Sequence, residues 1–481
     1  MVDLLRRRLE GKKLLLLGFG REGESSYRVI RELCPQMKIW IADRNSDVMG
    51  NTLLQEDRQV EFQCGVHYLD GLTRFDLILK SPGISLKESK EMKASDLTSR
   101  ITSQTDLFLE AFASQITGIT GTKGKSTTSS LIAHILTTAG KDAILLGNIG
   151  TPAWHFLKQI TPQTLIIDEL SSHQLEYIHY GPHISLLLNI FEEHLDAYDS
   201  FLDYQLAKMK IATTQSTGDL LLYNADDPLI CNHLRSMQKP SPPSPPSPPS
   251  PSSPPSPPSL IPLSLHHQFN IGAFKRGGEL VIRIPGRNEL VVPEPHNRYL
   301  KGEHNLRNIL AAVTTCWLQE VTEEAILDGL TSFKGMAHRM EYLGYHHAIH
   351  WVNDSIATIP EACIAAMQSI PDVDTLVLGG FDRGINYETL GRFLLRAPVR
   401  TLVLNGAAGR RIGTEMEKMD HTIKTRKKLF YISRFDDLLP LVLEHTRPGT
   451  TCLLSPAAAS YDEFRSFEER GFRFRELATE S

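Results

Sequence analysis

The sequence predicts an α/β protein of several domains, and three observations lead to this prediction. At 481 residues, 41% of them apolar, the chain is too long for one ordinary hydrophobic core and apolar enough to fill two or three. Short apolar runs alternate with longer helix-like stretches, as is typical of buried parallel strands joined by helices. Glycine-rich turns directly follow two of these runs. The apolar runs are residues 13–18, 39–43, 76–80, 115–120, 164–169, 184–189, 374–378, 400–404 and 450–454.

The composition argues against several classes of protein. Basic and acidic residues nearly balance, 51 against 56, and the formal net charge of −5 provides no bulk attraction to nucleic acid. No run approaches the roughly 20 apolar residues of a membrane span, and no signal-peptide core follows the N-terminal arginines. The six cysteines are scattered, without the close pairs of a zinc site or a redox dithiol. We therefore expect a cytoplasmic protein that binds neither nucleic acid nor membrane.

A Ser-Pro-Pro repeat occupies residues 239–260. Proline removes backbone donors and restricts φ, so the repeat predicts an extended, polyproline-II-like tether on the surface and the least ordered segment of the chain. A docking segment for an SH3 or WW module is one interpretation. An inert insertion into a surface loop is the simpler one.

The first glycine-rich turn is GFGREG at residues 18–23, directly after an apolar run. A GxGxxG motif in this position places backbone N–H groups and a helix start against a phosphate. Asp43 stands at the end of the next expected strand, where an acid that binds a ribose would lie, and Ser81 follows a later strand. These residues predict a nucleotide-like ligand. The alternative is that the glycines only permit a tight turn.

The second turn is GITGTKGKSTT at residues 118–128, between an apolar strand and a helix expected to begin near Ser126. In a phosphate loop, Lys125 would reach the β- and γ-phosphate oxygens, and the Ser126 hydroxyl would bind Mg²⁺. The strict pattern has glycine five positions before Gly124, where this chain has Ile119, so the loop is a variant. A solvated Gly-Lys turn is the alternative, which the strand–loop–helix context disfavours.

Polar blocks end later strands, at residues 147–150, 168–172 and 189–196. Because the carboxyl ends of parallel strands share one crevice, Glu169 and His194 can converge on a metal ion held by the loop. Each taken alone is more often a helix cap or a satisfied polar side chain, but their shared position favours a metal site. Lys208 taken alone is typical of a solvated helical lysine.

The last third of the chain contains four further polar islands, around Arg339, Asp354, Arg383 and Ser460. All but the first follow apolar runs, so they predict a second site at one sheet edge. Arg339 and Arg383 suit a carboxylate or a phosphate because the guanidinium group donates in a fork. Surface ion pairs are the alternative for either residue alone.

These blocks, together with FRSFEERG at residues 464–471, resemble the Mur ligases of peptidoglycan synthesis. The residues and the order of these motifs are most similar to the family members that add D-glutamate to UDP-N-acetylmuramoyl-L-alanine. The resemblance implies three domains: a Rossmann-like domain for the UDP moiety (1–111), a central P-loop ATPase with a mostly parallel sheet (112–335), and a C-terminal Rossmann-like domain for the amino acid (336–481). It implies ATP and two Mg²⁺ ions as cofactors, and UDP-N-acetylmuramoyl-L-alanine and glutamate as substrates.

The resemblance also assigns roles by position. ATP would bind to Gly121, Thr122, Lys123, Gly124, Lys125, Ser126, Thr127, Asn305, Asn308, Arg339 and Asp354. The UDP substrate would contact Gly18, Arg21, Glu22, Asp43, Ser81, Asn148 and His194. The amino acid would contact Thr358, Arg383, Ser460, Tyr461 and Phe467. The metal ligands would be Ser126, Glu169, His194 and a carbamylated Lys208, and the catalytic residues Lys125, His194, Lys208 and Arg339.

The implied reaction suits these residues. A carboxylate is a poor acylating agent, so ATP would convert it into an acyl phosphate, which an amine attacks with loss of phosphate. Lys125 and two divalent ions would offset the negative charge at the reacting oxygens. This chemistry needs no nucleophilic side chain, and the sequence offers no evident Cys–His or Ser–His pair.

Two departures from the family pattern fall on the expected amino-acid pocket. Ile356 replaces a lysine in the DSKAT motif, and Asp382-Arg383 replaces a glycine-lysine pair. Exchanging lysine for arginine changes the geometry offered to a carboxylate. L-glutamate therefore stays open as the amino acid. A folylpolyglutamate synthase-like ligase is a further alternative, disfavoured by the N-terminal GxGxxG domain, and a non-catalytic nucleotide-binding regulator is an alternative of another class.

Overall fold

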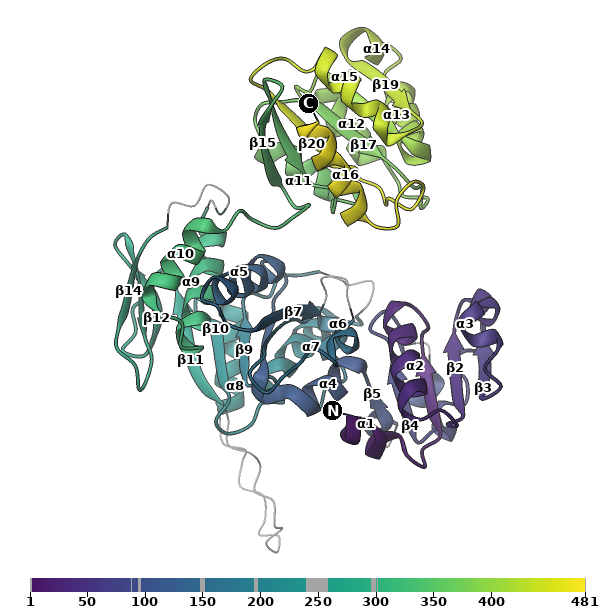
Figure 1. The fold of residues 1–481 in the computed structure, drawn as a ribbon, viewed down its shortest axis with the longest axis vertical. Coiled ribbons are helices and arrows are strands. Elements are labelled where there is room, and N and C mark those ends of the chain that lie inside the picture. Colours follow the sequence, from purple (N-terminus) through teal and green to yellow (C-terminus); the bar gives the residue numbers. More distant parts are fainter. Residues whose placement is uncertain are drawn as a thin grey trace, which may run out of the picture. The chain divides into compact units, whose positions relative to one another are not determined.

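The computed structural model describes residues 2–87, 89–93, 97–147, 152–193, 198–238, 258–295, 300 and 302–480. The chain divides into two compact units, Met1–Phe333 and Lys334–Ser481. The first unit contains two sheets and the second contains one. We describe each unit by itself (Figure 1).

The first sheet is fully parallel, with the strand order β3-β2-β1-β4-β5. Its strands are β1 (Leu14–Leu17), β2 (Ile39–Asp43), β3 (Val60–Cys64), β4 (Leu77–Lys80) and β5 (Ile101–Thr102). The helices of this part are α1 (Val2–Leu9), α2 (Arg21–Leu33), α3 (Thr52–Gln55) and α4 (Gln104–Phe112). The central strand β1 leads directly into α2, so the GxGxxG turn lies in the middle of the carboxyl edge.

The second sheet has nine strands in the order β14-β13-β12-β11-β10-β9-β6-β8-β7. Seven of these strands pair in parallel: β6 (Ile116–Thr120), β7 (Ala143–Gly147), β8 (Leu165–Glu169), β9 (Ile184–Leu187), β10 (Leu220–Asn224), β11 (Ser259–Ser264) and β12 (Gly272–Arg276). Strands β13 (Glu279–Arg283) and β14 (Leu290–Pro293) extend the sheet as an antiparallel meander.

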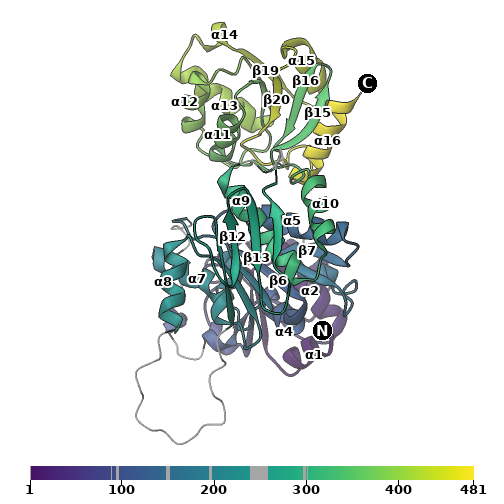
Figure 2. The same cartoon turned by 90° about the vertical axis from the view of Figure 1, so that its left-hand side faces the viewer.

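Helices cover both faces of this nine-stranded sheet (Figure 1 and Figure 2). Successive strand residues point to opposite faces: Leu186 packs in the cluster that contains Leu131 of α5, whereas Leu187 packs in the cluster that contains Tyr204 of α7. The helices are α5 (Lys125–Thr138), α6 (Ser172–Leu175), α7 (Phe201–Thr213), α8 (Pro228–Gln238), α9 (Glu303–Leu318) and α10 (Glu323–Ser332).

The second unit is built on a six-stranded sheet with the order β15-β16-β20-β17-β18-β19. Strands β15 (Glu341–His346) and β16 (Ile349–Asn353) form a hairpin, and β17 (Val373–Gly379), β18 (Thr401–Asn405), β19 (Lys428–Ile432) and β20 (Thr451–Leu454) continue in parallel. One hydrophobic cluster lies on each face. The helices are α11 (Pro360–Ser369), α12 (Glu388–Arg396), α13 (Gly406–Met419), α14 (Ile423–Arg426), α15 (Leu438–His445) and α16 (Phe467–Thr479).

The predicted α/β class with mostly parallel sheets is confirmed, and each of the nine apolar runs overlaps a strand. The predicted extent of the Ser-Pro-Pro tether, 239–260, is wrong at its end. Ser259 and Leu260 belong to β11, where they pair with Leu220 and Leu221 because β11 continues the parallel sheet beside β10. Residues 239–257 lie outside the described residues.

Within the described part of the chain, no helix combines the length and the apolar content that a bilayer crossing requires.

Candidate active site

The phosphate loop lies between β6 and α5, where the sequence predicted it. Gly121 has a φ of +157° and Gly124 a φ of +88°, and Gly124 also lacks the space for a side chain. A Cβ on Gly124 would lie 2.5 Å from Asn308 Oδ1 of α9. The loop can therefore approach α9 only because this position is glycine.

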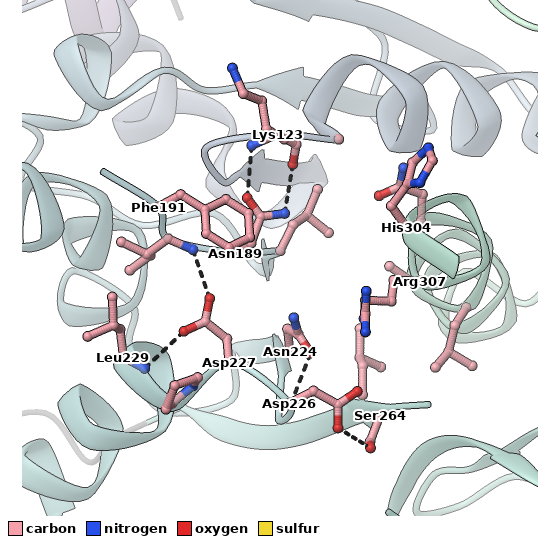
Figure 3. Close-up of a pocket in the computed structure, with 18 residues that line it drawn as sticks. Lys123, Asn189, Phe191, Asn224, Asp226, Asp227, Leu229, Ser264, His304 and Arg307 are labelled. Atoms are coloured by element: carbon pink, nitrogen blue, oxygen red, sulfur yellow. Dashed lines mark hydrogen bonds between the residues drawn. The ribbon is translucent and has the colours of Figure 1, made fainter. Parts of the chain in front are cut away.

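The end of β9 holds the loop in shape. The Asn189 carboxamide accepts from Lys123 N at 2.8 Å through Oδ1 and donates to Lys123 O at 2.9 Å through Nδ2 (Figure 3). Thr122 N donates to Asn189 O at 3.0 Å. Asn189 thus supports two consecutive loop residues before any ligand binds. The sequence placed Asn189 at a strand end but assigned it no role.

Lys125 is the first residue of α5, and its ammonium group lies over the loop. Lys125 Nζ donates to Gly121 O at 2.9 Å and to Thr122 O at 3.1 Å. Ser126 and Thr127 follow in the first turn of the helix. A positive charge and a helix N-terminus therefore meet at the loop, as the binding of a polyphosphate requires.

Lys208 of α7 reaches the same loop from the other side. Its side chain is buried, the residue being 2% exposed, and Lys208 Nζ donates to Gly121 O at 3.0 Å. Burial, followed by the nearby charge of Lys125, lowers the pKa of Lys208 to about 7, while Glu193 acts in the opposite direction. Lys208 is thus not the solvated helical lysine that its position alone suggested.

Both lysines line a cavity of about 280 Å³. Its walls come from the central sheet and, through the turn at Pro82 and Gly83, from the first sheet. A ligand bound to the first sheet can therefore extend toward the phosphate loop. The remaining lining residues are Ser171, Ser172, His173, Glu193 and Tyr204.

Two of the predicted metal ligands lie close to this loop. Glu169 ends β8 and is buried, and its strand neighbour Ile119 belongs to β6, which leads into the loop. Carboxylate and hydroxyl oxygens, as offered by Glu169 and Ser126, are ligands that Mg²⁺ prefers. His194 lies outside the described residues. Among the residues that the structure describes, no group of three or more His, Cys, Asp or Glu side chains could hold a metal ion.

A second cavity, of about 510 Å³, is lined by Lys123 and Gly124 of the loop (Figure 3). Asn308 lines it and donates through Nδ2 to Asn305 Oδ1 at 3.3 Å, so two of the residues predicted to bind ATP lie next to each other, one of them in the cavity wall. Residues that the sequence analysis did not single out also line it: Asn224, Asp226, Asp227, Ser264, His304 and Arg307.

The two aspartates of this cavity organise its floor. Asp227 accepts from Ile190 N and from Leu229 N, each at 2.9 Å, which joins the β9 end to the start of α8. Asp226 accepts from Leu265 N at 2.9 Å, just beyond β11. Both aspartates could have been predicted from the sequence, because they form a polar stretch directly after β10. Polar stretches after other strands were interpreted as parts of a site.

On the first sheet, three predicted residues share the carboxyl edge. Asp43 Oδ2 accepts from Phe19 N at 2.7 Å, and Ser81 Oγ donates to Gly18 O at 3.0 Å. A Cβ on Gly23 would lie 2.1 Å from Gly18 O, so α2 can start here only with glycine. Gly18, Asp43 and Ser81 therefore lie close together at this edge.

Arg21 and Glu22 line a smaller cavity of about 210 Å³ together with Asp168 and Gln174. Burial raises the pKa of Glu22 to about 7, with Lys80 acting in the opposite direction. Burial also raises the pKa of Asp168 to about 7, and the nearby carboxylates of Glu22 and Glu169 add to the shift. Asn148, the remaining predicted contact of the UDP substrate, lies outside the described residues.

In the second unit, the structure brings Arg339 and Asp354 together. Arg339 is exposed and stands between His338 and Met340, whose φ values are +61° and +46°. Asp354 Oδ1 accepts from Met340 N at 3.1 Å. Burial raises the pKa of Asp354 to about 6, while hydrogen bonds and the charge of Arg339 act in the opposite direction.

The predicted amino-acid contacts lie in loops that follow strands of the same unit and at the start of α16. The Arg383 guanidinium carbon lies 5.4 Å from the centre of the Tyr461 ring, and Asp382 pairs with Arg411 of α13. Ser460 is buried and Thr358 is half-buried. Phe467 begins α16, and its carbonyl accepts from Ser355 Oγ at 2.8 Å.

Comparison with known proteins agrees with this arrangement. A family model described as Mur ligase middle domain matches residues 119–316. A UDP-N-acetylmuramoylalanine–D-glutamate ligase of Pelobacter propionicus is 31% identical over 467 residues, which cover 97% of this chain and 98% of that protein. The ligase of the same name from Geobacillus kaustophilus is 32% identical, with 96% of each chain covered.

Among solved structures, MurF from Acinetobacter baumannii is similar with a TM-score of 0.57 at 14% identity. The match covers 99% of this chain and 98% of that chain, which shows a shared fold over the full length. The sequence relatives and the fold thus lead to one conclusion: the chain belongs to the Mur ligase family.

Proposed function

We propose that the protein is an ATP-dependent ligase that joins the carboxylate of UDP-N-acetylmuramoyl-L-alanine to the amino group of D-glutamate. The observation that carries the proposal is the convergence of Lys125 and Lys208 on Gly121 O, in a cavity that residues of the first sheet also line. The names of the relatives described above agree with this substrate pair.

The chain's residues suit the formation of an acyl phosphate. ATP supplies the phosphoryl group that turns the carboxylate into an acylating agent. Lys125 and the start of α5 place positive charge where the phosphoryl oxygens would lie. Asn305 and Asn308 are proposed to bind the adenine beside the larger cavity, and Arg339 and Asp354 are proposed as further ATP ligands.

Mg²⁺ would be held by Ser126, Glu169 and His194, and it would offset charge on the phosphates. We further propose that Lys208 is carbamylated. An amine whose pKa is about 7 is partly neutral at neutral pH, and the neutral amine forms the N–C bond with CO₂ as a proton leaves. The resulting carboxylate would add a metal ligand beside the loop.

Two remaining groups of residues are proposed to bind the UDP moiety and the amino acid. Gly18, Asp43 and Ser81 would bind the UDP moiety at the first sheet, with Arg21, Glu22 and Asn148 next to them. Thr358, Arg383, Ser460, Tyr461 and Phe467 would bind the amino acid. The Ser-Pro-Pro tract is proposed to be an inert insertion.

Phosphate release with ATP, Mg²⁺ and UDP-N-acetylmuramoyl-L-alanine tests the proposal, with D- and L-glutamate offered separately. Release that depends on D-glutamate is expected. Release with L-glutamate alone would keep the ligase chemistry and overturn the D-amino-acid assignment. Release with neither amino acid would overturn the ligase assignment.

Lys125→Ala should lower kcat by at least about a hundredfold, because the phosphoryl charge loses a preorganised cation. Its fold should be unchanged, since the half-buried side chain donates to loop carbonyls and is not part of the described hydrophobic clusters. Lys141→Ala is the matched control, because Lys141 is exposed just beyond the other end of α5. Near-normal turnover of the Lys125 variant would contradict the assignment of the phosphate loop.

A further inference from the structure

Arg470 lies deep inside the second unit, and the reaction described above does not use it. The residue is on α16 and is 1% exposed. Its guanidinium group donates to Ser355 Oγ at 3.0 Å, Ser355 O at 2.9 Å, Ala458 O at 3.0 Å, Ala459 O at 3.1 Å and Gly379 O at 3.4 Å. A guanidinium group has five N–H donors, which equals the number of these hydrogen bonds, so every donor can have an acceptor.

These acceptors lie on three segments that follow neighbouring strands. Ser355 follows β16, Ala458 and Ala459 follow β20, and Gly379 ends β17, and these strands are adjacent in the order β16-β20-β17. One planar group therefore joins three strand ends that the chain reaches at very different points of its sequence. The same segments lead into the proposed amino-acid contacts Thr358, Ser460 and Arg383.

The backbone around Arg470 is tight and strained. Gly380 has a φ of +134°, and a Cβ there would lie 2.2 Å from Ala459 O and 3.0 Å from Arg470 Nη1. Ala457, which is not glycine, has a φ of +55°. A non-glycine residue in the left-handed region persists when its surroundings determine its conformation. The hydrogen bonds from Arg470 to the next two residues provide such a constraint.

The charged guanidinium group of Arg470 bonds to the backbone and to a hydroxyl rather than to a carboxylate. Burial lowers the pKa of Arg470 to about 10, while nearby Asp462 acts in the opposite direction, so the group is protonated at neutral pH. Buried cations commonly pair with a carboxylate. The acceptors of Arg470 are instead four carbonyl oxygens and a hydroxyl, which points to the control of backbone geometry.

We propose that Arg470 is a positioning residue, whose planar guanidinium group fixes the segments after β16, β17 and β20 in the arrangement that binds the acidic amino acid. The proposal rests on the proposed function for the identity of the ligand. The control of the three segments stands on the contacts of Arg470 alone.

Arg470→Lys and Arg470→Gln in the full-length enzyme test the proposal. Lysine keeps the charge but donates from a single atom, and glutamine loses the charge. Both variants should raise the KM for glutamate by about tenfold or more, while the KM values for ATP and the UDP substrate change less than about twofold. Amide hydrogen exchange should accelerate in residues 353–359, 378–384 and 456–461.

Arg473→Lys is the matched control, one turn along the same helix. Arg473 is only partly exposed, and it donates to Asp436 at 2.6 Å and to Glu476 at 2.9 Å. This variant should change neither the KM for glutamate nor the exchange of the three segments. If the Arg470 variants do not fold, Ser355→Ala takes their place, since it removes one acceptor and should shift both readouts in the same direction.

Unchanged exchange in the three segments, or an equal rise of all three KM values, would overturn the proposal. An effect in Arg470→Gln without one in Arg470→Lys would also overturn it, because charge rather than fork geometry would then be responsible. If the wild-type enzyme does not turn over glutamate, the proposed function fails, while the exchange measurement still decides whether Arg470 holds the segments.

Discussion

Lys208 shows how burial changes the chemistry of an ordinary side chain. On a solvated helix face its amine would stay protonated at neutral pH, but here it lies against the carbonyl of Gly121 and near Lys125. Because desolvation and a neighbouring cation both disfavour the ammonium form, the neutral amine becomes accessible. That form is the one that carbamylation needs.

The lowered pKa of Lys208 predicts a pH-dependent stability. The folded state binds this proton less tightly than the unfolded chain, where the pKa is near 10.5. The penalty on folding is therefore fully present below about pH 7 and disappears as the pH rises toward 10.5. Lys208→Met should raise the free energy of unfolding by on the order of 2 kcal/mol near pH 6.5, and by less at higher pH.

Denaturant unfolding in CO₂-free buffer without nucleotide measures this effect, at about pH 6.5, 8 and 9.5. Lys210→Met, on the same helix at a less buried position, is the control and should show no comparable trend. A gain that is the same at every pH would show that packing alone, rather than the titration of Lys208, explains the stabilisation.

At the scale of elements, the phosphate loop depends on its contact with α9. Gly124→Ala would place a methyl group 2.5 Å from Asn308 Oδ1 and would also strain a backbone with a φ of +88°. Because Asn308 lines the cavity that we propose for ATP, the substitution should weaken ATP binding by about tenfold or more, measured by calorimetric titration.

Gly140→Ala separates the effect of backbone strain from that of the steric contact with Asn308. Gly140, just beyond the end of α5, has a φ of +71°, but nothing lies within 4 Å of an added Cβ. It should lower stability by about 1 kcal/mol through backbone strain and leave ATP affinity unchanged. Equal ATP affinities of the two variants would mean that the contact between Gly124 and Asn308 does not control ATP binding.

Elements that carry their own signal were predictable from the sequence. Parallel strands buried on both faces read as continuous apolar runs, which is why β6, β8 and β9 were found. The meander was not found, because β12 ends in Arg276 and β13 begins with Glu279, and these charged residues leave only short apolar runs. The hairpin strand β15 contains glycine, tyrosine and histidine, so it has no such signal either.

The same distinction applies to the site. Glu169 ends a strand and Lys125 follows the turn after another, positions that the order of motifs reveals. Asn189 supports the loop through hydrogen bonds to Lys123, 66 residues away, and Arg470 reaches Ser355 across 115 residues. Such contacts depend on how strands are ordered in the sheet, which no local pattern specifies.

At the scale of the whole molecule, the described hydrophobic clusters each lie within one unit. Three belong to Met1–Phe333 and two to Lys334–Ser481, the latter on opposite faces of the six-stranded sheet. Since a sheet with both faces covered forms a complete core, residues 334–481 should fold alone. Circular dichroism of this fragment should show a cooperative thermal transition.

The addition of ATP provides the control for this prediction. It should raise the melting temperature of the full-length protein, whose phosphate loop lies in the first unit, and leave that of the fragment nearly unchanged. A fragment that melts without cooperativity would show that its two clusters need the first unit to hold together.

The place where the Ser-Pro-Pro tract joins the fold has a practical consequence. The tract leads into β11 beside Leu220, the first residue of β10, whereas the cavity of about 510 Å³ lies at the other end of β10, around Asn224. Ser259, the first residue of β11, therefore lies at the sheet edge opposite to the cavity that we propose for ATP. A fluorescent reporter or an affinity tag can be grafted between residues 240 and 257, so that the enzyme is tracked or immobilised with both termini left free.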